Sequence, residues 1–449
     1  MHINKIFSLT FVPFLLLGTP NIEWFQQYNG SAEESHGHFI MTCEDGGYLQ
    51  IGESNFLPNS KIFIVKTDSY GELLWSREIN IGGHNLGNSA VELSDGYLIC
   101  GSLNRNSALI KLDKNNGSTI FSRTYNNGGT DAFEHAALTP DGIVAVGYVY
   151  AQDPNNTFYT EGQGFIMFTD EEGNEISSLN LNQYISQAYR IKYINNSLII
   201  SGLSEEAFDF KVIKMNLDGE VIWHQEYGGS NYDHCFGMDV SSDGNIFLAG
   251  HTLSGTQNWD TYTIKLNSNG DLIWEQKVGN PRGFNPQYIH DEAWGIKATN
   301  DGGCVTIAGT GDEYNYSQCN GNDCSDTWNA YLIKFDNIGN VDFETTFSSL
   351  DLYNYAYDWA GEDIDLTDDG GAVIAVDNGQ FGFLKIDGIQ TNLIGDINFD
   401  SMIDILDVVI LVNVVLGLEQ NNVSDINQDN TVNILDVVQL INIILNFEI

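Results

Sequence analysis

The sequence predicts an all-β, seven-bladed β-propeller followed by a small α-helical domain, and three observations support this fold class. A short unit, in which a turn rich in Asp, Asn and Gly precedes an apolar run, recurs seven times at intervals of 46 to 68 residues. A segment near the N-terminus has the pattern that the seventh unit lacks. Near the C-terminus, two rows of oxygen-bearing side chains each precede an apolar run of helical length.

Each repeated unit reads as four short antiparallel strands. The second strand follows the turn, the third ends in most units in a Lys before an acid or Asn, and the fourth carries Trp or Phe in most units. β-branched and aromatic residues between tight turns favour antiparallel sheets, and four strands repeated seven times indicate radially packed blades, whereas a β-helix has much shorter repeats. The turns with their second strands are "DGGYLQIG", "DGYLICG", "DGIVAVG", "NNSLIISG", "DGNIFLAG", "DGGCVTIAG" and "DGGAVIAV".

The seventh unit lacks its fourth strand, and the N-terminal segment supplies the missing pattern. Residues 22–28, "IEWFQQY", read like the Trp-bearing strands "LLWSREI" and "VIWHQEY" of other units. We predict that 22–28 completes the last blade and closes the ring, so that the propeller spans 20–388. A short linker is expected at 389–394. The repeats resemble those of secreted bacterial β-propellers, a resemblance over about 22–387 that implies the fold and not an activity.

The first residues predict export. Lys5 precedes an apolar run from Ile6 to Leu17, which has the size of a signal-peptide core, so we expect a signal peptide at 1–19; a buried strand is the alternative. The expected location is secreted or cell-surface associated, outside the cell. Cys319 and Cys324 flank a polar loop, and both a small disulfide between them and two free thiols remain open.

The charge excludes one class of partner. The 449 residues carry 61 Asp and Glu against 18 Lys and Arg, a net charge of −43 that repels nucleic acid and anionic membranes and attracts divalent cations. We therefore expect no nucleic-acid partner. No later segment reaches the roughly 18 apolar residues that a membrane helix needs, so no transmembrane segment is expected.

Positions that recur in every blade are explained by the blade, and departures from the repeat are more informative. The recurring lysines, such as Lys66 and Lys334, are interpreted as structural. Length varies only in the loops of one face, which we call the long-loop face: 148–164, 279–295, 309–331 and 348–361. His36, His135, His234 and His290 fall near the starts of innermost strands and are interpreted as turn contacts.

Aromatic residues are frequent in the loops of the long-loop face. Flat rings beside carboxylates stack on sugar faces, so these residues predict a carbohydrate ligand, and packing of the loops against each other is the alternative. No catalytic residue is identified. The candidate substrate-binding residues are Tyr314, Tyr316, Trp328, Tyr353, Tyr355 and Trp359.

Two stretches near the C-terminus carry the spacing of calcium loops. Oxygen-bearing residues fall at positions 1, 3, 5, 9 and 12 of a twelve-residue loop, and a backbone carbonyl is free at position 7, a pattern that wraps a hard cation such as Ca²⁺. The second copy follows the first by 29 residues, and each runs into an apolar helix. The predicted ligands of two calcium sites are Asp396, Asn398, Asp400, Met402, Asp404 and Asp407, then Asp425, Asn427, Asp429, Thr431, Asn433 and Asp436.

Residues 395–449 resemble a type I dockerin in ligand pattern, duplicated loop–helix order and Asp at position 12. The resemblance implies a calcium-dependent domain that binds a cohesin-like domain of a partner protein. The Gly usual at position 6 is replaced by Ser401 and Asn430. Positions 10 and 11, which contact the partner in dockerins, carry aliphatic residues in place of hydroxyls, so we expect a partner unlike the cellulosome cohesins: Ile405, Leu406, Ile434 and Leu435.

These features together predict a secreted binding or recognition propeller that a calcium-dependent dockerin-like domain attaches to a partner protein, with a role in polysaccharide utilisation. The alternative is a docked polysaccharide-degrading enzyme, a glycoside hydrolase or polysaccharide lyase, with its site on the long-loop face. A structural surface protein is a third class, in which that face has no ligand.

Overall fold

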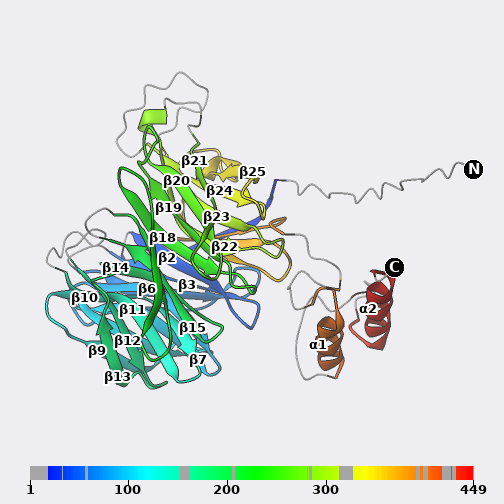
Figure 1. The fold of residues 1–449 in the computed structure, drawn as a ribbon, viewed down its shortest axis with the longest axis horizontal. Helices are drawn as coiled ribbons and strands as arrows, with labels where there is room; N and C mark the ends of the chain where they lie inside the picture. The colour runs from blue at the N-terminus through cyan, green and yellow to red at the C-terminus, as the bar shows by residue number, and fades with distance from the viewer. Residues whose placement is uncertain are drawn as a thin grey trace, which may run out of the picture.

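A computed structural model describes residues 19–32, 34–55, 59–151, 162–204, 208–280, 282, 286–312, 327–390, 395–397, 403–416, 426 and 431–447. Within them, 28 strands form seven four-stranded sheets, and two helices follow the last strand (Figure 1). Neighbouring strands of every sheet pair antiparallel. The predicted seven-bladed β-propeller is therefore confirmed.

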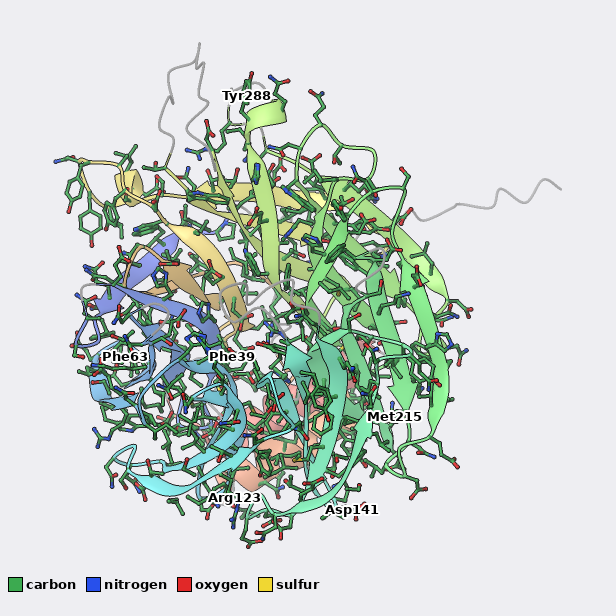
Figure 2. All side chains as sticks on the ribbon, turned by 90° about the vertical axis from the view of Figure 1, so that its left-hand side faces the viewer. Phe39, Phe63, Arg123, Asp141, Met215 and Tyr288 are labelled. Carbon is green, nitrogen blue, oxygen red and sulfur yellow. The ribbon has the colours of Figure 1, made fainter. Side chains whose placement is uncertain are left out.

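The innermost strands form a closed ring, because each packs against the innermost strand of the next blade and the last packs against the first. Figure 2 shows the blades around this centre, with Phe39 near the middle and Arg123, on an outermost strand, near the rim. The innermost strands are β2 (Ser35–Thr42), β6 (Asn85–Leu93), β10 (Thr130–Thr139), β14 (Gln187–Ile194), β18 (Asp233–Val240), β22 (His290–Ala298) and β26 (Ala360–Leu366).

The second and third strands of each blade form the core. The second strands are β3 (Tyr48–Ser54), β7 (Gly96–Leu103), β11 (Gly142–Ala151), β15 (Ser197–Leu203), β19 (Ile246–Thr252), β23 (Cys304–Gly311) and β27 (Ala372–Asp377). The third strands are β4 (Lys61–Thr67), β8 (Asn106–Asp113), β12 (Gln163–Thr169), β16 (Phe210–Met215), β20 (Asp260–Leu266), β24 (Asn329–Phe335) and β28 (Phe381–Ile386). They read as nearly continuous apolar runs because neighbouring blades cover both faces: Ile51 and Ile64 share one core with Ile99 and Ile110 of the next blade.

The outermost strands are more exposed, with apolar and polar residues alternating in most of them. They are β5 (Leu73–Ile79), β9 (Thr119–Tyr125), β13 (Glu175–Asn180), β17 (Val221–Tyr227), β21 (Leu272–Val278), β25 (Val341–Phe347) and β1 (Ile22–Tyr28). Two short 3₁₀ turns, η1 (Pro286–Tyr288) and η2 (Ser349–Asp351), lie in loops of the long-loop face.

Strand β1 is the outermost strand of the last blade, where it pairs with β28. Trp24 lies opposite Lys385, in the same register in which Trp75 faces Lys66 and Trp274 faces Lys265. The pairing joins the two ends of the propeller chain through backbone hydrogen bonds and leaves the last sheet with the same four strands as the others.

Four of the recurring lysines bind an Asp in the turn between the first two strands of their own blade, whereas Lys214 and Lys265 bind backbone carbonyls of the next blade. The ammonium of Lys334 lies 2.6 Å from Asp301, and that of Lys66 lies 2.9 Å from Asp45. Lys111 and Lys385 pair in the same way with Asp95 and Asp369. The structure thus gives these lysines the structural role expected from their repetition.

The two helices of the C-terminal domain, α1 (Ile405–Val415) and α2 (Ile434–Phe447), share a small core. Its buried members come in pairs separated by the 29-residue offset of the loops, which shows that the two halves of the domain repeat each other. The pairs are Ile397 with Ile426, Val408 with Val437, and Leu411 with Leu440.

Candidate functional site

Every innermost strand carries a β-bulge at the same place. In β2, for example, Gly37 pairs with Gly52 and Phe39 with Ile51, so that His38 is the extra residue. Bulges re-aim a side chain and are frequent beside functional sites. The seven extra residues, which we call the bulge ring, are His38, Asn88, Glu134, Tyr189, Phe236, Trp294 and Glu362.

The glycine that ends the second-strand motif permits the bulge in five blades. A Cβ placed on Gly250 would lie 1.7 Å from the carbonyl oxygen of His234, and one on Gly52 would lie 1.8 Å from that of His36. No side chain fits at such a separation, so only glycine lets the bulged strand approach. Gly101, Gly147 and Gly202 have the same relation to their innermost strands.

All seven members of the bulge ring line one cavity in the centre of the propeller, with a volume of about 530 Å³. This volume is within the range of small-ligand sites. The bulge-ring residues lie in the first halves of the innermost strands, on the side where the chain enters from the long-loop face. Other residues of the lining are His36, Glu53, His84, Leu86, Tyr148, Arg190 and Asp377.

The bulge ring has an aromatic side and a polar side. Tyr189, Phe236 and Trp294 come from three consecutive blades, and their rings touch: the Phe236 centroid lies 5.0 Å from that of Tyr189 and 4.4 Å from that of Trp294. The other four blades contribute two carboxylates, an amide and an imidazole. The cavity therefore offers an aromatic wall of mutually tilted rings opposite a set of hydrogen-bonding and charged groups.

Burial shifts the titration of the groups on the polar side. Desolvation raises the pKa of Glu134 to about 7, although Arg190 and His38 oppose the shift. The pKa of Glu362 is raised well above its ordinary value by burial and then by the charges of Asp377, Glu292 and Asp363. Burial disfavours a charged His36, but the hydrogen bond and charge of Asp377, 2.5 Å away, outweigh it and raise the pKa of His36.

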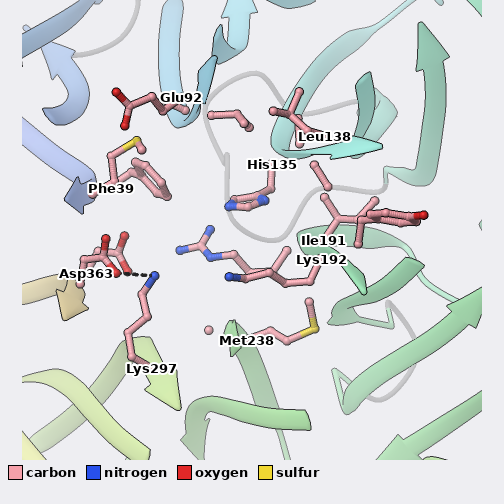
Figure 3. Close-up of a pocket in the computed structure, with 18 of the residues that line it drawn as sticks. Phe39, Glu92, His135, Leu138, Ile191, Lys192, Met238, Lys297 and Asp363 are labelled. Carbon is pink, nitrogen blue, oxygen red and sulfur yellow. Dashed lines mark ion pairs between the residues drawn. The ribbon is translucent and has the colours of Figure 1, made fainter. Parts of the chain in front are cut away.

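A second cavity of about 390 Å³ follows along the same channel, and Arg190 lines both. Its charges are paired: Lys297 lies 2.9 Å from Asp365, and Lys192 lies 2.9 Å from Asp239. Figure 3 shows Lys297 reaching towards the carboxylates of β26 beside Asp363. Burial disfavours charge on Lys297, but Asp365, Asp239 and Asp363 outweigh it and raise its pKa. Lys192 and Lys297 of this cavity are thus each paired with a carboxylate.

Trp359 does not offer a ring to a ligand, contrary to the sequence prediction. Its side chain is 0 % exposed, because the ring stacks on Phe25 at 4.3 Å and belongs to the core of the last blade. Trp328 is half-buried, and its ring covers Gly309 and Gly311 of β23. Both tryptophans therefore hold the loops against the propeller, which is the packing alternative.

Two of the predicted tyrosines are exposed. Tyr355 is 63 % exposed, and its ring stacks on that of Tyr357 at 5.3 Å, with Tyr353 beside both. These three rings form a small aromatic platform on the loop between β25 and β26, which we call the tyrosine platform. Tyr314 and Tyr316 lie outside the described residues, as do Cys319 and Cys324.

The histidines that the sequence pattern assigned to turns have several environments. His234 and His251 lie 3.1 Å apart between Nδ1 and Nε2, and His290 lies 3.1 Å from Glu292. His36, in contrast, lines the cavity of the bulge ring, so for this residue the turn interpretation is incomplete. The bulge ring itself was missed, although the recurring glycine that permits five of its bulges is visible in the repeat.

The two calcium-loop copies end in the same way. Asp404, at position 9, caps α1 by accepting a hydrogen bond from the Leu406 amide at 2.7 Å, and Asp407, at position 12, accepts from the Asp404 amide at 2.8 Å. Asn433 and Asp436 make the equivalent bonds at the start of α2, at 2.8 and 2.7 Å. This reciprocal capping fixes position 12 against position 9 in both halves.

The donor set fits a divalent cation. Asp396, Asp407 and Asp436 are buried, yet residues 388–449 contain nine Asp and Glu and no Lys, Arg or His. Buried carboxylates need a compensating positive charge, and the chain provides none in this region. Thr431 is described and exposed; Asn398, Asp400, Met402, Asp425, Asn427 and Asp429 lie outside the described residues.

The helices leave an apolar surface uncovered. The four predicted partner-contact residues, Ile405, Leu406, Ile434 and Leu435, are each more than half exposed, as are Val409 and Val438 one turn further on. These are equivalent positions in the two halves. Exposed aliphatic patches of this kind mark protein–protein contact sites.

Comparison with known proteins agrees with the two parts of the fold. Residues 394–445 match the family model of the dockerin type I domain, and residues 222–255 match a β-propeller repeat. The WD40 domain of Neurospora crassa Pan2 is similar at a TM-score of 0.51 and 10 % identity, over 82 % of this chain and 96 % of that one. The WD40 propeller of Doa1 has a TM-score of 0.49 and 8 % identity, over 82 % and 97 %. No curated protein matches the sequence.

The chain is thus a seven-bladed β-propeller that carries a C-terminal dockerin type I domain. Dockerin type I domains bind calcium and attach the proteins that carry them to cohesin partners, so this propeller is attached to a partner through its dockerin domain. Among the described helices, none is long and apolar enough to span a membrane.

Proposed function

We propose that this protein is a secreted recognition propeller, held outside the cell on a cohesin-bearing protein by a dockerin domain that folds around two calcium ions. The observation that carries the proposal is the duplicated loop–helix unit, in which capping bonds, buried carboxylates and core residues all recur at an offset of 29 residues. When bound, calcium supplies the positive charge that the carboxylates of each loop need.

Calcium titration of the full chain tests the number of sites. Isothermal calorimetry should give two calcium ions per chain for the wild type, one after Asp396→Ala or Asp425→Ala, and none after both substitutions. The two single variants remove position 1 of one loop each, so they serve as controls for each other. A single ion per wild-type chain would contradict the two-site proposal.

We propose that the exposed aliphatic surface of the dockerin domain contacts the cohesin. Ile405 and Leu406 of one half and Ile434 and Leu435 of the other present apolar side chains to solvent, so they favour a partner with an apolar surface. Positions 10 and 11 of the two loops carry the same residue pair, Ile-Leu, so each half offers the partner the same contacts.

Surface plasmon resonance against a panel of purified cohesin domains tests this contact. Binding should require calcium and should fall at least 100-fold in Leu406→Lys with Leu435→Lys, because a buried lysine without a partner is costly at an apolar interface. Gln439→Lys, at an exposed position of α2, is the control and should bind normally. Binding that survives EDTA or the double substitution would refute the assignment.

For the propeller, we propose carbohydrate recognition on the long-loop face through the tyrosine platform. The exposed rings of Tyr353 and Tyr355, with Tyr357 stacked on Tyr355, support this role, since such rings bind the apolar faces of sugars. A glycan array should show binding that Tyr353→Ala with Tyr355→Ala weakens and Tyr70→Ala, at an exposed tyrosine of a β4–β5 turn, does not. Release of reducing sugar by the wild type would instead favour the docked enzyme.

A further inference from the structure

We propose that the bulge ring is a second binding site, independent of the dockerin domain and of the tyrosine platform, and that it takes a protonated amine carried on a ring-shaped body, such as an amino sugar. The site is the 530 Å³ cavity at the centre of the propeller.

The identities of the bulge-ring residues indicate a ligand site. The backbone repeats the same bulge seven times, so a purely structural requirement would repeat the same side chain, as it does for the buried lysines. The bulge ring instead contains six residue types in seven equivalent positions. Equivalent backbone positions with divergent side chains that all face one cavity are what an asymmetric ligand requires.

The charge of the cavity favours a cation. Glu53, Glu134, Glu362 and Asp377 line it. Asp377 is paired with His36 at 2.5 Å, and the three glutamates face one Lys or Arg among the described lining residues, Arg190. The neighbouring cavity, in contrast, is lined by three cations and three carboxylates, and its Lys192 and Lys297 each lie 2.9 Å from a carboxylate. The same channel thus balances its charges in one half and leaves an excess of carboxylates in the other.

Among the buried polar atoms of the lining, Glu53 Oε2 and His84 Nε2 have no hydrogen-bond partner within the described residues. Glu53 is 8 % exposed and His84 3 % exposed, so bulk water does not readily replace the missing partners. Glu53 has only the Nε2 of His38, 3.8 Å from its other oxygen, as an ion-pair contact. An amine with flanking hydroxyls provides donors for Glu53 and an acceptor or donor for His84.

The aromatic side of the bulge ring fits the rest of the ligand. The touching rings of Tyr189, Phe236 and Trp294, tilted by 59° and 35° against one another, form an aromatic wall on which the apolar face of a sugar ring packs with more contact than a flexible chain. Aromatic faces also attract cations, so the wall and the carboxylates opposite it favour the same sign of charge. The raised pKa values of Glu134 and Glu362 agree with this, because an incoming cation replaces the protons that these carboxyls hold in its absence.

Calorimetric titration of the full chain in calcium at pH 7 tests the proposal with three sugars of one shape. Glucosamine should bind, and glucose and N-acetylglucosamine, which differ in lacking the charged amine, should bind at least tenfold more weakly. Absence of glucosamine binding at millimolar concentration, or equal binding of the three sugars, would overturn the proposal. Lysine amide carries its amine on a flexible chain. If it binds as tightly as glucosamine, the inference of a ring-shaped ligand is refuted.

Substitutions in the bulge ring test whether glucosamine binds in this cavity. Glu134→Gln with Glu362→Gln should weaken glucosamine binding at least tenfold, and so should Trp294→Ala. Glu171→Gln with Glu172→Gln, in an exposed turn between β12 and β13, removes the same number of charges far from the cavity and should leave binding within twofold. Unchanged binding in the bulge-ring variants, with a melting temperature that shows them folded, would exclude this cavity. Because the dockerin domain takes no part, loss of calcium binding does not affect the outcome.

Discussion

The side chain of Lys334 is 0 % exposed, and its ammonium is held by Asp301 at 2.6 Å and by the Phe335 carbonyl at 2.9 Å. Burial opposes ionisation of Asp301, but the charge and hydrogen bond of Lys334 outweigh it and lower the pKa of Asp301. The same pair recurs in three other blades, where it ties the third strand to the first turn of the same blade. A buried charge of this kind is stable only while its partner is present.

Asp301→Ala should therefore destabilise the protein. The substitution leaves the ammonium of Lys334 buried, with Asp342 at 3.6 Å as its nearest remaining carboxylate. We expect the free energy of unfolding to fall by about 3 kcal/mol, as for other broken buried pairs. Urea denaturation measures this, and Asp218→Ala, in an exposed turn, is the control. A loss below about 1 kcal/mol would place the pair among surface salt bridges.

Glu134 gives a pH-dependent prediction. The groups that face it are Arg190, His38 and Tyr148. Its pKa in the folded protein is about 7, above that of an unfolded glutamate, so without ligand the folded state loses stability as pH rises from about 4.5 to 7.

Glu134→Gln removes this loss. We expect the variant to melt at a higher temperature than the wild type at pH 8 and at the same temperature at pH 4.5, by calorimetry without ligand. His36, Glu53, His84, Glu362 and Asp377 line the same cavity and are present in both proteins, so the comparison isolates Glu134. If the variant and the wild type melt at the same temperature at pH 8, ionisation of Glu134 does not destabilise the folded protein.

At the scale of single elements, the bulge of β18 depends on one glycine in the strand beside it. A Cβ on Gly250 would lie 1.7 Å from the His234 carbonyl oxygen, so the two strands of Gly250→Ala must separate or the bulge must flatten. We expect a loss of about 2 to 3 kcal/mol, in the range of overpacked cores. Gly255→Ala, where open space surrounds the Cβ and only the positive φ opposes it, should cost about 1 kcal/mol. Equal losses in the two variants would show that the bulge tolerates a side chain.

The strands and helices were largely predictable from the sequence, and the loops were not. Short, nearly continuous apolar runs between turns predicted the seven blades, because strands such as β3 and β24 are covered on both faces by neighbouring blades. The bulge ring was not predicted. Gly52 and its equivalents mark the bulges, but a glycine in a strand does not show where the side chain of the residue opposite it points. Trp359 was assigned to a ligand and is core, because composition alone does not show which ring in a loop turns inward.

At the scale of the whole molecule, the pairing of β1 with β28 makes the ring of blades continuous. Deletion of residues 22–28 exposes the backbone edge of β28 and removes Phe25 from its stack on Trp359. We expect the deletion variant to aggregate or to melt at a much lower temperature, by size-exclusion chromatography and calorimetry. A variant that lacks residues 1–21 keeps β1 and is the control. A deletion variant that melts like this control would refute closure by β1.

Calorimetry of the full chain with and without calcium tests the central claim most directly, that a metal-folded docking domain is attached to a propeller that folds without it. In calcium we expect two transitions, one for each domain. In excess EDTA, and equally in Asp396→Ala with Asp425→Ala, the transition of the dockerin domain should disappear while that of the propeller stays unchanged. Two transitions that are identical in calcium and in EDTA would contradict the account, because the carboxylate-rich loops would then fold without a cation.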